Sequence, residues 1–424
     1  MEARGRYWRR LLGLLARRLP EMGLGRVPDP RGRNGRRWPL ATLLSSMLIG
    51  LAAGCRSLRE VEHLTANLSR GVRGLLHIGR RVADTTLREV LVRIEPDSIR
   101  EVLRRLVRQA HRRKALRPDG LPCGVLSMDG KATPTPIIDD KYAQRQGNGA
   151  QIHGMLRTTT STLISAPGRP CIDAMPIPAS TNEVGSFAAA FDAVRTAYPE
   201  DLFEIVMGDA GLTSLANATH VHDADRGYIF QIKPDSQKTL YAEAYRTLGR
   251  LGPEDALATH EERINGRHET RTLWLSTELE AFGDWTHLRV VLRLERRTVD
   301  SIGDVTHGIR YFVSNVHKGR FDKDQWLAVL RRRWAVENEC HHTFDTAFAE
   351  DDSLFVHDPH GMLVVVLLRR VVYTMLALFR SVTQRADERR AVPWRDLLWD
   401  ISHALAAAAE EVLRDLRLRP DPGS

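Results

Sequence analysis

Apolar residues in the first part of the chain recur at helical spacing. The pattern predicts helices over Trp38–Cys55, Ser57–Leu68, Asp84–Ile94 and Pro96–Ala110, because apolar positions three or four residues apart share one face of a helix. Together they predict a compact helical unit over residues 38–115. Such a unit could place one helix against DNA, or it could be a scaffold that only packs on the rest of the protein. The pattern favours neither interpretation.

The first of these helices is apolar enough to be compared with a membrane span. Trp38–Cys55 carries no charged residue and is near the minimum length for crossing a bilayer. It contains Pro39 and two glycines, however, and its apolar residues follow helical spacing, which favours a buried helix. The other long apolar stretch, Met362–Phe379, is interrupted by Arg369 and Arg370. We therefore expect no association with a membrane.

After Gly124 the pattern changes to short apolar runs typical of strands. Two of these runs flank Pro167-Gly168, which predicts a hairpin. Helical patterns separate the later runs, and this order is that of a mixed α/β layer. The expected order is a strand at Val125–Met128, strands at Met155–Ile164 and Cys171–Pro176, a helix at Asn182–Ala197, a strand at Leu202–Met207, a helix at Thr213–Asp223 and a strand at Gly227–Ile232.

Residues 240–316 form a different region. Short runs of β-branched and aromatic residues predict strands at Thr270–Leu275, His287–Glu295 and Gly308–Val316, and hence a β-rich insertion. Helical periodicity returns afterwards. It predicts two long helices, Lys323–Phe348 and Pro359–Thr383, and an amphipathic C-terminal helix, Trp394–Leu416.

Composition and charge narrow the class of protein. The 424 residues are 42% hydrophobic and 27% charged, as in soluble folded proteins, and the net charge is +9. Most of the surplus lies in residues 1–38, and we expect a flexible basic arm and linker at residues 1–37. A basic chain favours a polyanion such as nucleic acid. Four widely spaced cysteines favour a reducing, cytoplasmic location.

Two aspartates share a sequence context that suggests chemistry. Asp129 and Asp209 each follow a short apolar strand and precede a small residue. Loops that open at strand ends are where mixed α/β folds commonly place functional side chains. Taken singly, each aspartate could instead cap the next turn.

Glu337 lies in a column of ionisable residues on the predicted helix Lys323–Phe348. Arg333, Glu337, His341 and Asp345 are each four residues apart and share one helical face. Such a column could be an exposed ladder of ion pairs. Combined with the two aspartates, however, Glu337 completes a set of carboxylates that suits Mg²⁺, which prefers oxygen ligands. Two ions about 3.5–4 Å apart can support phosphoryl transfer on nucleic acid.

Three motifs resemble those of the DDE insertion-sequence transposases, and the ISAs-type branch of the IS-four-related group is the most similar. They are Asp129-Gly130-Lys131, Gly208-Asp209-Ala210 and the stretch from Arg333-Trp334-Ala335-Val336-Glu337-Asn338 to Glu350-Asp351. Ser180-Thr181-Asn182-Glu183 and the strand ending at Lys233 are similar to two further family segments. The resemblance covers roughly residues 28–385.

The resemblance implies an α/β fold with a ribonuclease H-like mixed-sheet core. The expected catalytic domain is 120–385, with the β-rich insertion at about 240–316, preceded by the helical domain 38–115 and followed by a C-terminal helix and tail at 386–424. By resemblance, Asp129, Asp209 and Glu337 are catalytic and hold two Mg²⁺ ions, for which Mn²⁺ can substitute.

The same resemblance implies an activity and partners. The expected reaction is cleavage at transposon ends followed by transfer of the 3′-OH strand into target DNA. The partners are double-stranded DNA, as inverted-repeat ends and as target, and a second copy of the chain in a homodimer on paired ends. Arg333, and more weakly His341, Lys131 and Lys233, are candidate DNA contacts.

Some positions depart from the family pattern. Residues 132–136 differ from the usual continuation after Asp129-Gly130-Lys131, and Leu330 and Phe344 stand where the broader group has Tyr and Lys. Two alternatives therefore stay open. The chain could be a domesticated or inactive transposase derivative that only binds DNA, or a ribonuclease H-like nuclease that only cuts.

Overall fold

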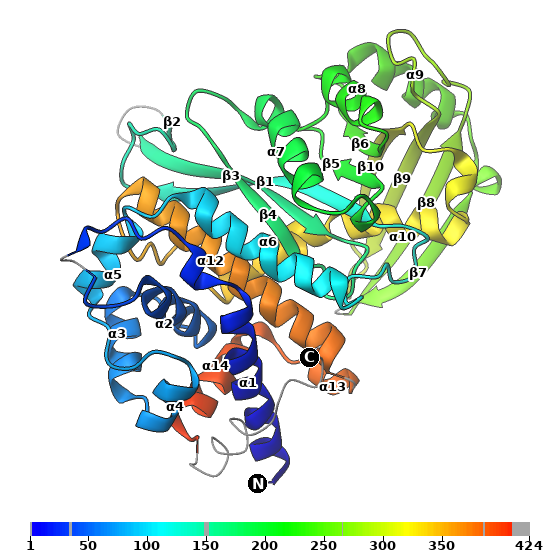
Figure 1. Cartoon of the computed structure of the whole chain (residues 1–424). Coiled ribbons are helices and arrows are strands. Elements are labelled where there is room, and N and C mark those ends of the chain that lie inside the picture. The colour runs from blue at the N-terminus through cyan, green and yellow to red at the C-terminus, as the bar shows by residue number, and fades with distance from the viewer. Residues whose placement is uncertain (1, 34–35, 148–151, 265, 385, 409–424) are drawn as a thin grey trace.

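The computed structural model describes residues 2–33, 36–147, 152–264, 266–384 and 386–408. Helices precede and follow a large mixed sheet (Figure 1). The helices are α1 (Glu2–Glu21), α2 (Leu40–Ala52), α3 (Leu58–Asn67), α4 (Arg70–Leu75), α5 (Asp84–Leu91), α6 (Pro96–Arg112), α7 (Glu183–Ala197), α8 (Leu215–Asp223), α9 (Lys238–Gly249), α10 (Lys323–Arg333), α11 (His342–Thr346), α12 (Pro359–Leu378), α13 (Asp387–Arg390) and α14 (Trp394–Ala406).

Within the described residues, ten strands form one sheet. Its order is β2-β3-β1-β5-β6-β10-β9-β8-β7, and β4 pairs with β3. The strands are β1 (Val125–Thr135), β2 (Ala143–Gln146), β3 (His153–Leu163), β4 (Cys171–Ile177), β5 (Ile205–Gly208), β6 (Gly227–Ile232), β7 (Ala258–Ile264), β8 (Arg267–Ser276), β9 (Val290–Val299) and β10 (Val305–Ser314).

The central part of the sheet has the expected ribonuclease H-like arrangement. Strands β4, β3, β1, β5 and β6 lie in that order, with β3 antiparallel to β1 and to β4, and β5 parallel to β1 and to β6. Helix α7 connects β4 to β5, and α8 connects β5 to β6. The predicted mixed α/β fold with a helical N-terminal region is therefore confirmed.

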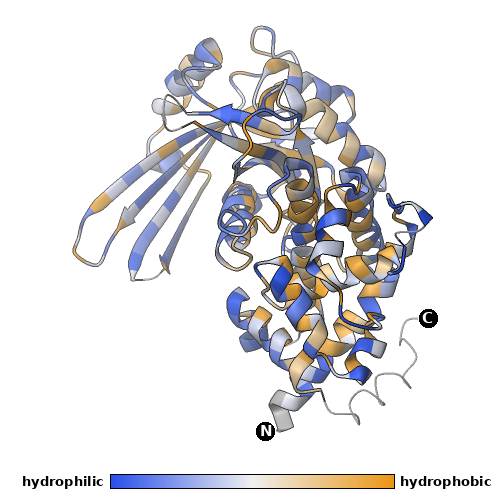
Figure 2. Ribbon diagram, turned by 90° about the vertical axis from the view of Figure 1, so that its left-hand side faces the viewer, coloured by the Kyte–Doolittle hydropathy of each residue, from blue (hydrophilic) through white to orange (hydrophobic). Residues whose placement is uncertain are grey.

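The β-rich segment contains two elements that the sequence pattern did not predict. Strand β7 and helix α9 join the three expected strands, and α9 packs against β8, β9 and β10. Strand β10 also pairs with β6, so the segment extends the core sheet. Figure 2 shows its long strands projecting away from the helical part.

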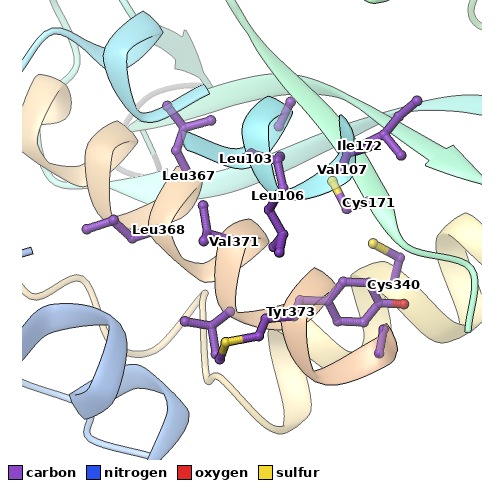
Figure 3. Close-up of a cluster of buried hydrophobic side chains, with 14 of the residues drawn as sticks. Leu103, Leu106, Val107, Cys171, Ile172, Cys340, Leu367, Leu368, Val371 and Tyr373 are labelled. Carbon is purple, nitrogen blue, oxygen red and sulfur yellow. The ribbon is translucent and has the colours of Figure 1, made fainter. Parts of the chain in front are cut away.

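The centre of the molecule is helix α12. It packs against α2, α5, α6 and strand β4. Figure 3 shows the apolar side chains where it meets α6 and β4. By length and composition Pro359–Thr383 could span a membrane, yet 94% of its apolar window is buried inside the protein. These features are those of a core helix, since a buried helix can be apolar on every side.

Buried ion pairs fix this helix and the N-terminal region to the sheet. Arg370 of α12 donates to Glu350, and both side chains are fully buried. Burial alone would raise the pKa of Glu350, but the charges of Arg370 and Arg369 hold it below its usual value. In α6, Arg100 donates to Asp173 of β4 at 2.9 Å. Removing one partner of such a pair leaves an uncompensated charge in the core.

The first residues are not the flexible arm that their charge suggested. Residues 2–21 form α1, which packs against α14, and Trp8 Nε1 donates to Asp400 Oδ1 at 3.2 Å. Leu11, Leu12 and Leu15 are buried in the main core. The arginines of this helix alternate with leucines at helical spacing, so one face is apolar despite the net charge.

Three other predicted boundaries change. Strand β1 continues through Asp129 to Thr135, because it keeps pairing with β3 after β5 has ended. The expected helix Lys323–Phe348 is interrupted by a π-helical turn at Val336–His341. Helix α14 ends at Ala406, and residues 409–416 of the predicted helix lie outside the described residues.

The buried face of α1 predicts a stability effect. Leu11→Ala should lower the free energy of unfolding by about 2–5 kcal/mol, since it removes a fully buried side chain and leaves a cavity. Arg17→Ala, at an exposed position of the same helix, should change it by less than about 0.5 kcal/mol. Urea unfolding measures both. Equal, small effects would contradict the placement of α1 in the core.

Candidate active site

The pairing of β1 with β5 brings the two aspartates together. These strands are parallel, and their last paired residues are Met128 and Gly208. Asp129 and Asp209 directly follow these two residues, so they lie side by side where the pairing of β1 with β5 ends. Side chains alternate along a strand, and Asp129 therefore shares a face with Ser127, whose hydroxyl donates to the Arg333 carbonyl at 3.3 Å. That face is covered by the end of α10.

Glu337 lies in the π-helical turn that follows α10. Its Oε1 is 3.3 Å from Nη1 of Arg333, which is 3% exposed, whereas the Glu337 side chain is 42% exposed. A π-helical turn widens the helix by one residue and turns the following residues by about 100° relative to a continuous α-helix. The predicted column of four residues on one face is thus interrupted: Arg333 reaches Glu337, His341 turns toward Asp129 and Asp345 reaches Lys131.

The charges of the three carboxylates act on one another. Burial, followed by the negative charges of Asp209 and Glu337, raises the pKa of Asp129 to about 8. Burial lowers the pKa of Arg333, while Glu337, Asp129 and Asp209 each act to raise it. Both effects place the three acids and Arg333 within electrostatic range of one another. The structure brings these predicted residues together.

The donor set suits a divalent cation, although the side chains do not form a closed cage. Carboxylate oxygens are the ligands that Mg²⁺ prefers, and burial and the neighbouring acids disfavour the charged form of Asp129, which a bound cation would favour. Within the described ranges, no three His, Cys, Asp or Glu side chains are close enough together to hold a metal ion. The residue types and the excess of negative charge therefore fit the ion, whereas the carboxylates lie farther apart than in a closed metal site.

Two of the weaker candidates for DNA contact have other partners. The Lys131 ammonium lies 2.8 Å from Asp345 Oδ1 and 3.1 Å from Asp351 Oδ1 and is largely buried. Nδ1 of His341 is 3.6 Å from Asp129 Oδ2. Burial, helped by the nearby positive charges, lowers the pKa of His341 to about 3, so its imidazole is neutral at physiological pH. These contacts favour positioning roles over contacts with phosphate.

Lys233 is placed differently. It directly follows β6, which runs parallel to β5, and it is exposed. The C-terminal ends of parallel strands meet at one edge of a sheet, and Asp209 follows β5 at that edge. Lys233 therefore stays available to a ligand that approaches the aspartates from this edge.

Glu183 is an acidic residue near the site whose role the sequence pattern did not indicate. It is the first residue of α7, after the N-cap Asn182. A methyl group on Gly130 would lie 2.3 Å from Glu183 Oε1, so the carboxylate rests against the bare backbone beside Asp129. Its negative charge adds to the rise in the pKa of Asp129. The similarity of residues 180–183 to a family segment was the one signal that pointed to it.

Comparisons with known proteins add a family relation for part of the chain. Residues 22–107 match the family described as DDE_Tnp_1-associated. This segment covers α2 to α5 and the first part of α6 and indicates a relationship to DDE transposases, but it contains none of the three carboxylates. No curated protein matches the chain.

Among solved structures, a cryo-EM structure of the piggyBac transposase synaptic complex with hairpin DNA is similar to this chain. It is 10% identical, with a TM-score of 0.41 over 98% of this chain and 84% of the other. A likeness at this level carries no conclusion about function.

The repulsion at Asp129 predicts a stabilising substitution. Between about pH 4 and pH 8 the folded wild type must bury a charge or take up a proton, so its stability falls as the pH rises through this window. Without metal, Asp129→Asn should raise the free energy of unfolding at pH 7.5 by about 1–3 kcal/mol and flatten its pH dependence.

Urea unfolding in EDTA at several pH values measures the effect. Asp192→Asn on α7 is the matched control, because that carboxylate is 43% exposed and pairs with His220 and Arg195. A variant at Asp129 that is less stable than the wild type at pH 7.5 would contradict the charge repulsion.

Proposed function

We propose that this chain is a DNA transposase of the DDE type, belonging to the ISAs-type branch. The observation that carries the proposal is the parallel β1–β5 pairing that sets Asp129 beside Asp209, where burial and the negative charges of Asp209 and Glu337 raise the pKa of Asp129. The family match of residues 22–107 supports it independently, because that segment lies outside the site.

In this proposal the three carboxylates hold two Mg²⁺ ions, or Mn²⁺ in their place. Bound there, divalent ions supply an activated oxygen nucleophile and stabilise the leaving oxygen of an in-line phosphoryl transfer. Asp129 and Asp209 contribute from neighbouring strands, so the rigid sheet fixes their separation. Glu337 is on the exposed π-helical turn and completes the set from the opposite side.

The surrounding residues position these acids. Arg333 holds Glu337 and reduces the repulsion among the carboxylates. The neutral imidazole of His341 lies 3.6 Å from Asp129 Oδ2, so it limits the space around that carboxylate without adding a positive charge that would compete with a cation. Lys131, through Asp345 and Asp351, fastens β1 to the segment that follows Glu337.

The proposed substrates are inverted-repeat ends and a target duplex, and the proposed products are a cut end and its 3′-OH strand joined to the target. We further propose that two copies act on paired ends, in the cytoplasm. The net charge of +9 suits a polyanionic substrate.

Incubation with DNA tests this proposal. The full chain would be mixed with Mg²⁺ or Mn²⁺, a plasmid carrying the DNA that flanks its gene on both sides, and a target plasmid. We expect cut ends and joined products. Asp129→Asn, Asp209→Asn and Glu337→Gln should each lower both by about 100-fold or more, because each removes a charge that the transition state requires. Asp192→Asn should act like the wild type.

The possible outcomes separate the candidate functions. Cutting without joining would favour a nuclease that only cuts. DNA binding without cutting, in the presence of either metal, would favour a transposase derivative that has lost catalysis. Equal cutting by the wild type and the three site variants would overturn the assignment of the carboxylates.

A further inference from the structure

A groove lined by arginines opens next to Glu337. Its volume is about 560 Å³, and it lies between the β8–β10 strands and the end of α10. Six arginines line it, against two glutamates. The arginines are Arg169, Arg271, Arg296, Arg310, Arg331 and Arg332.

Strand alternation explains why these charges share one wall. On β9, Arg293 donates to the Leu248 carbonyl of α9, and so the odd-numbered side faces that helix. Leu294 and Arg296 face the opposite side and line the groove. Arg296 is directly opposite Arg271 of β8. Glu262 and Glu269 already balance the charge of Arg271, so Arg296 is the member of this pair whose charge is left for an anionic ligand.

Two of the arginines have neither a hydrogen-bond partner nor an ion-pair partner among the described residues. Arg271 and Arg331 both pair with Glu262. In the described part of the chain, by contrast, no hydrogen bond or ion pair engages the guanidinium of Arg296 or Arg310. Arg310 instead lies over the Trp334 ring, 4.5 Å from its centroid. A guanidinium held against an aromatic ring keeps its charge and its outward N–H donors free for a phosphate.

Arg310 also connects the groove to the site. Burial and the positive charges of Arg333 and Arg296 lower its pKa, while Glu337 acts to raise it. Arg333 lies against the same Trp334 ring, at 4.2 Å, and contacts Glu337. Glu337 itself lines the groove. An anion in the groove would therefore reach the carboxylates without leaving the protein surface.

We infer that this groove binds the sugar–phosphate backbone of a single DNA strand leading to the carboxylate site, an inference that rests on the function proposed above. The excess of guanidinium groups selects a polyanion, and arginine forks match phosphate oxygens. The volume is that of pockets that enclose small molecules, so one strand fits and a duplex does not. Arg296 and Arg310 supply the free donors.

DNA binding in EDTA tests the inference without any cleavage. The probes are a labelled 20-nucleotide single strand and the matching duplex, titrated with the full chain at several salt concentrations. For the single strand, Arg296→Ala/Arg310→Ala should raise Kd by about 10-fold or more. It should also reduce the slope of log K against log salt by about 1.4, since two phosphate contacts are lost. Duplex binding should change by less than about 3-fold, because the groove is sized for one strand and not for a duplex.

Two further variants serve as controls. Arg250→Ala/Arg289→Ala removes the same charge from two exposed arginines that pair with Glu278 and Glu280, and it should bind both probes like the wild type. Arg296→Lys/Arg310→Lys keeps the charge and should retain most of the salt slope. Unfolding curves confirm that each variant is folded.

The inference is overturned if the Arg296/Arg310 alanine variant binds the single strand like the wild type. It is also overturned if the variant loses no more affinity than the Arg250/Arg289 control, or if the wild type binds no single strand. These outcomes are distinct from a failure of the proposed function. A wild type that binds through the groove but never cuts would leave the inference standing and remove the transposase activity. If the wild type cuts DNA normally and the Arg296/Arg310 alanine variant binds the single strand like the wild type, the transposase activity stands and the inference about the groove is removed.

Discussion

The concentration of negative charge around Asp129 is the constraint on which the rest of this structure depends. Parallel pairing of β1 with β5 places Asp129 beside Asp209, and the turn after α10 adds Glu337. A fold gains nothing in stability from this arrangement, since burial and the charges of Asp209 and Glu337 make Asp129 harder to ionise. Such an arrangement is typical of sites where a cation or a reacting phosphate compensates the charge.

Much of the neighbouring structure serves to keep this arrangement in place. Arg333 is buried against the acids, and Lys131 and Arg370 neutralise Asp345, Asp351 and Glu350 on the segment that follows Glu337. These pairs join β1, the π-helical turn and the core helix α12. The positive groove on the other side of Glu337 has the opposite imbalance, with guanidinium groups that lack carboxylates. The carboxylate site and the arginine groove are therefore adjacent, so a cation could bind at the first and a polyanion at the second.

The sequence pattern predicted what depends on short-range periodicity. The strands that lead to Asp129 and Asp209, the hairpin around Pro167-Gly168 and helix α7 follow from local residue spacing, although β1 continues past Asp129. The parallel pairing that joins the two aspartates depends on residues 80 positions apart, and only a family resemblance suggested it. The prediction of a flexible arm at residues 1–37 was wrong because it rested on the charge of this segment and not on the leucine spacing that forms α1.

Other features could not be predicted because they arise from packing. The π-helical turn at Val336–His341 has no proline or glycine to mark it, and a regular helix fits the same residues. Glu183 becomes part of the site only because α7 begins beside Gly130, where the absence of a side chain admits its carboxylate. The arginine groove combines residues from three strands, a turn and a helix, which no local pattern relates.

The account depends most on the claim that the three carboxylates take up divalent cations together. The most direct measurement is a crystal structure with Mn²⁺, whose anomalous scattering locates the ions. The account predicts anomalous peaks among Asp129, Asp209 and Glu337, with the Glu337 side chain drawn toward them. Peaks at other residues, or none at Mn²⁺ concentrations that support cleavage, would contradict it.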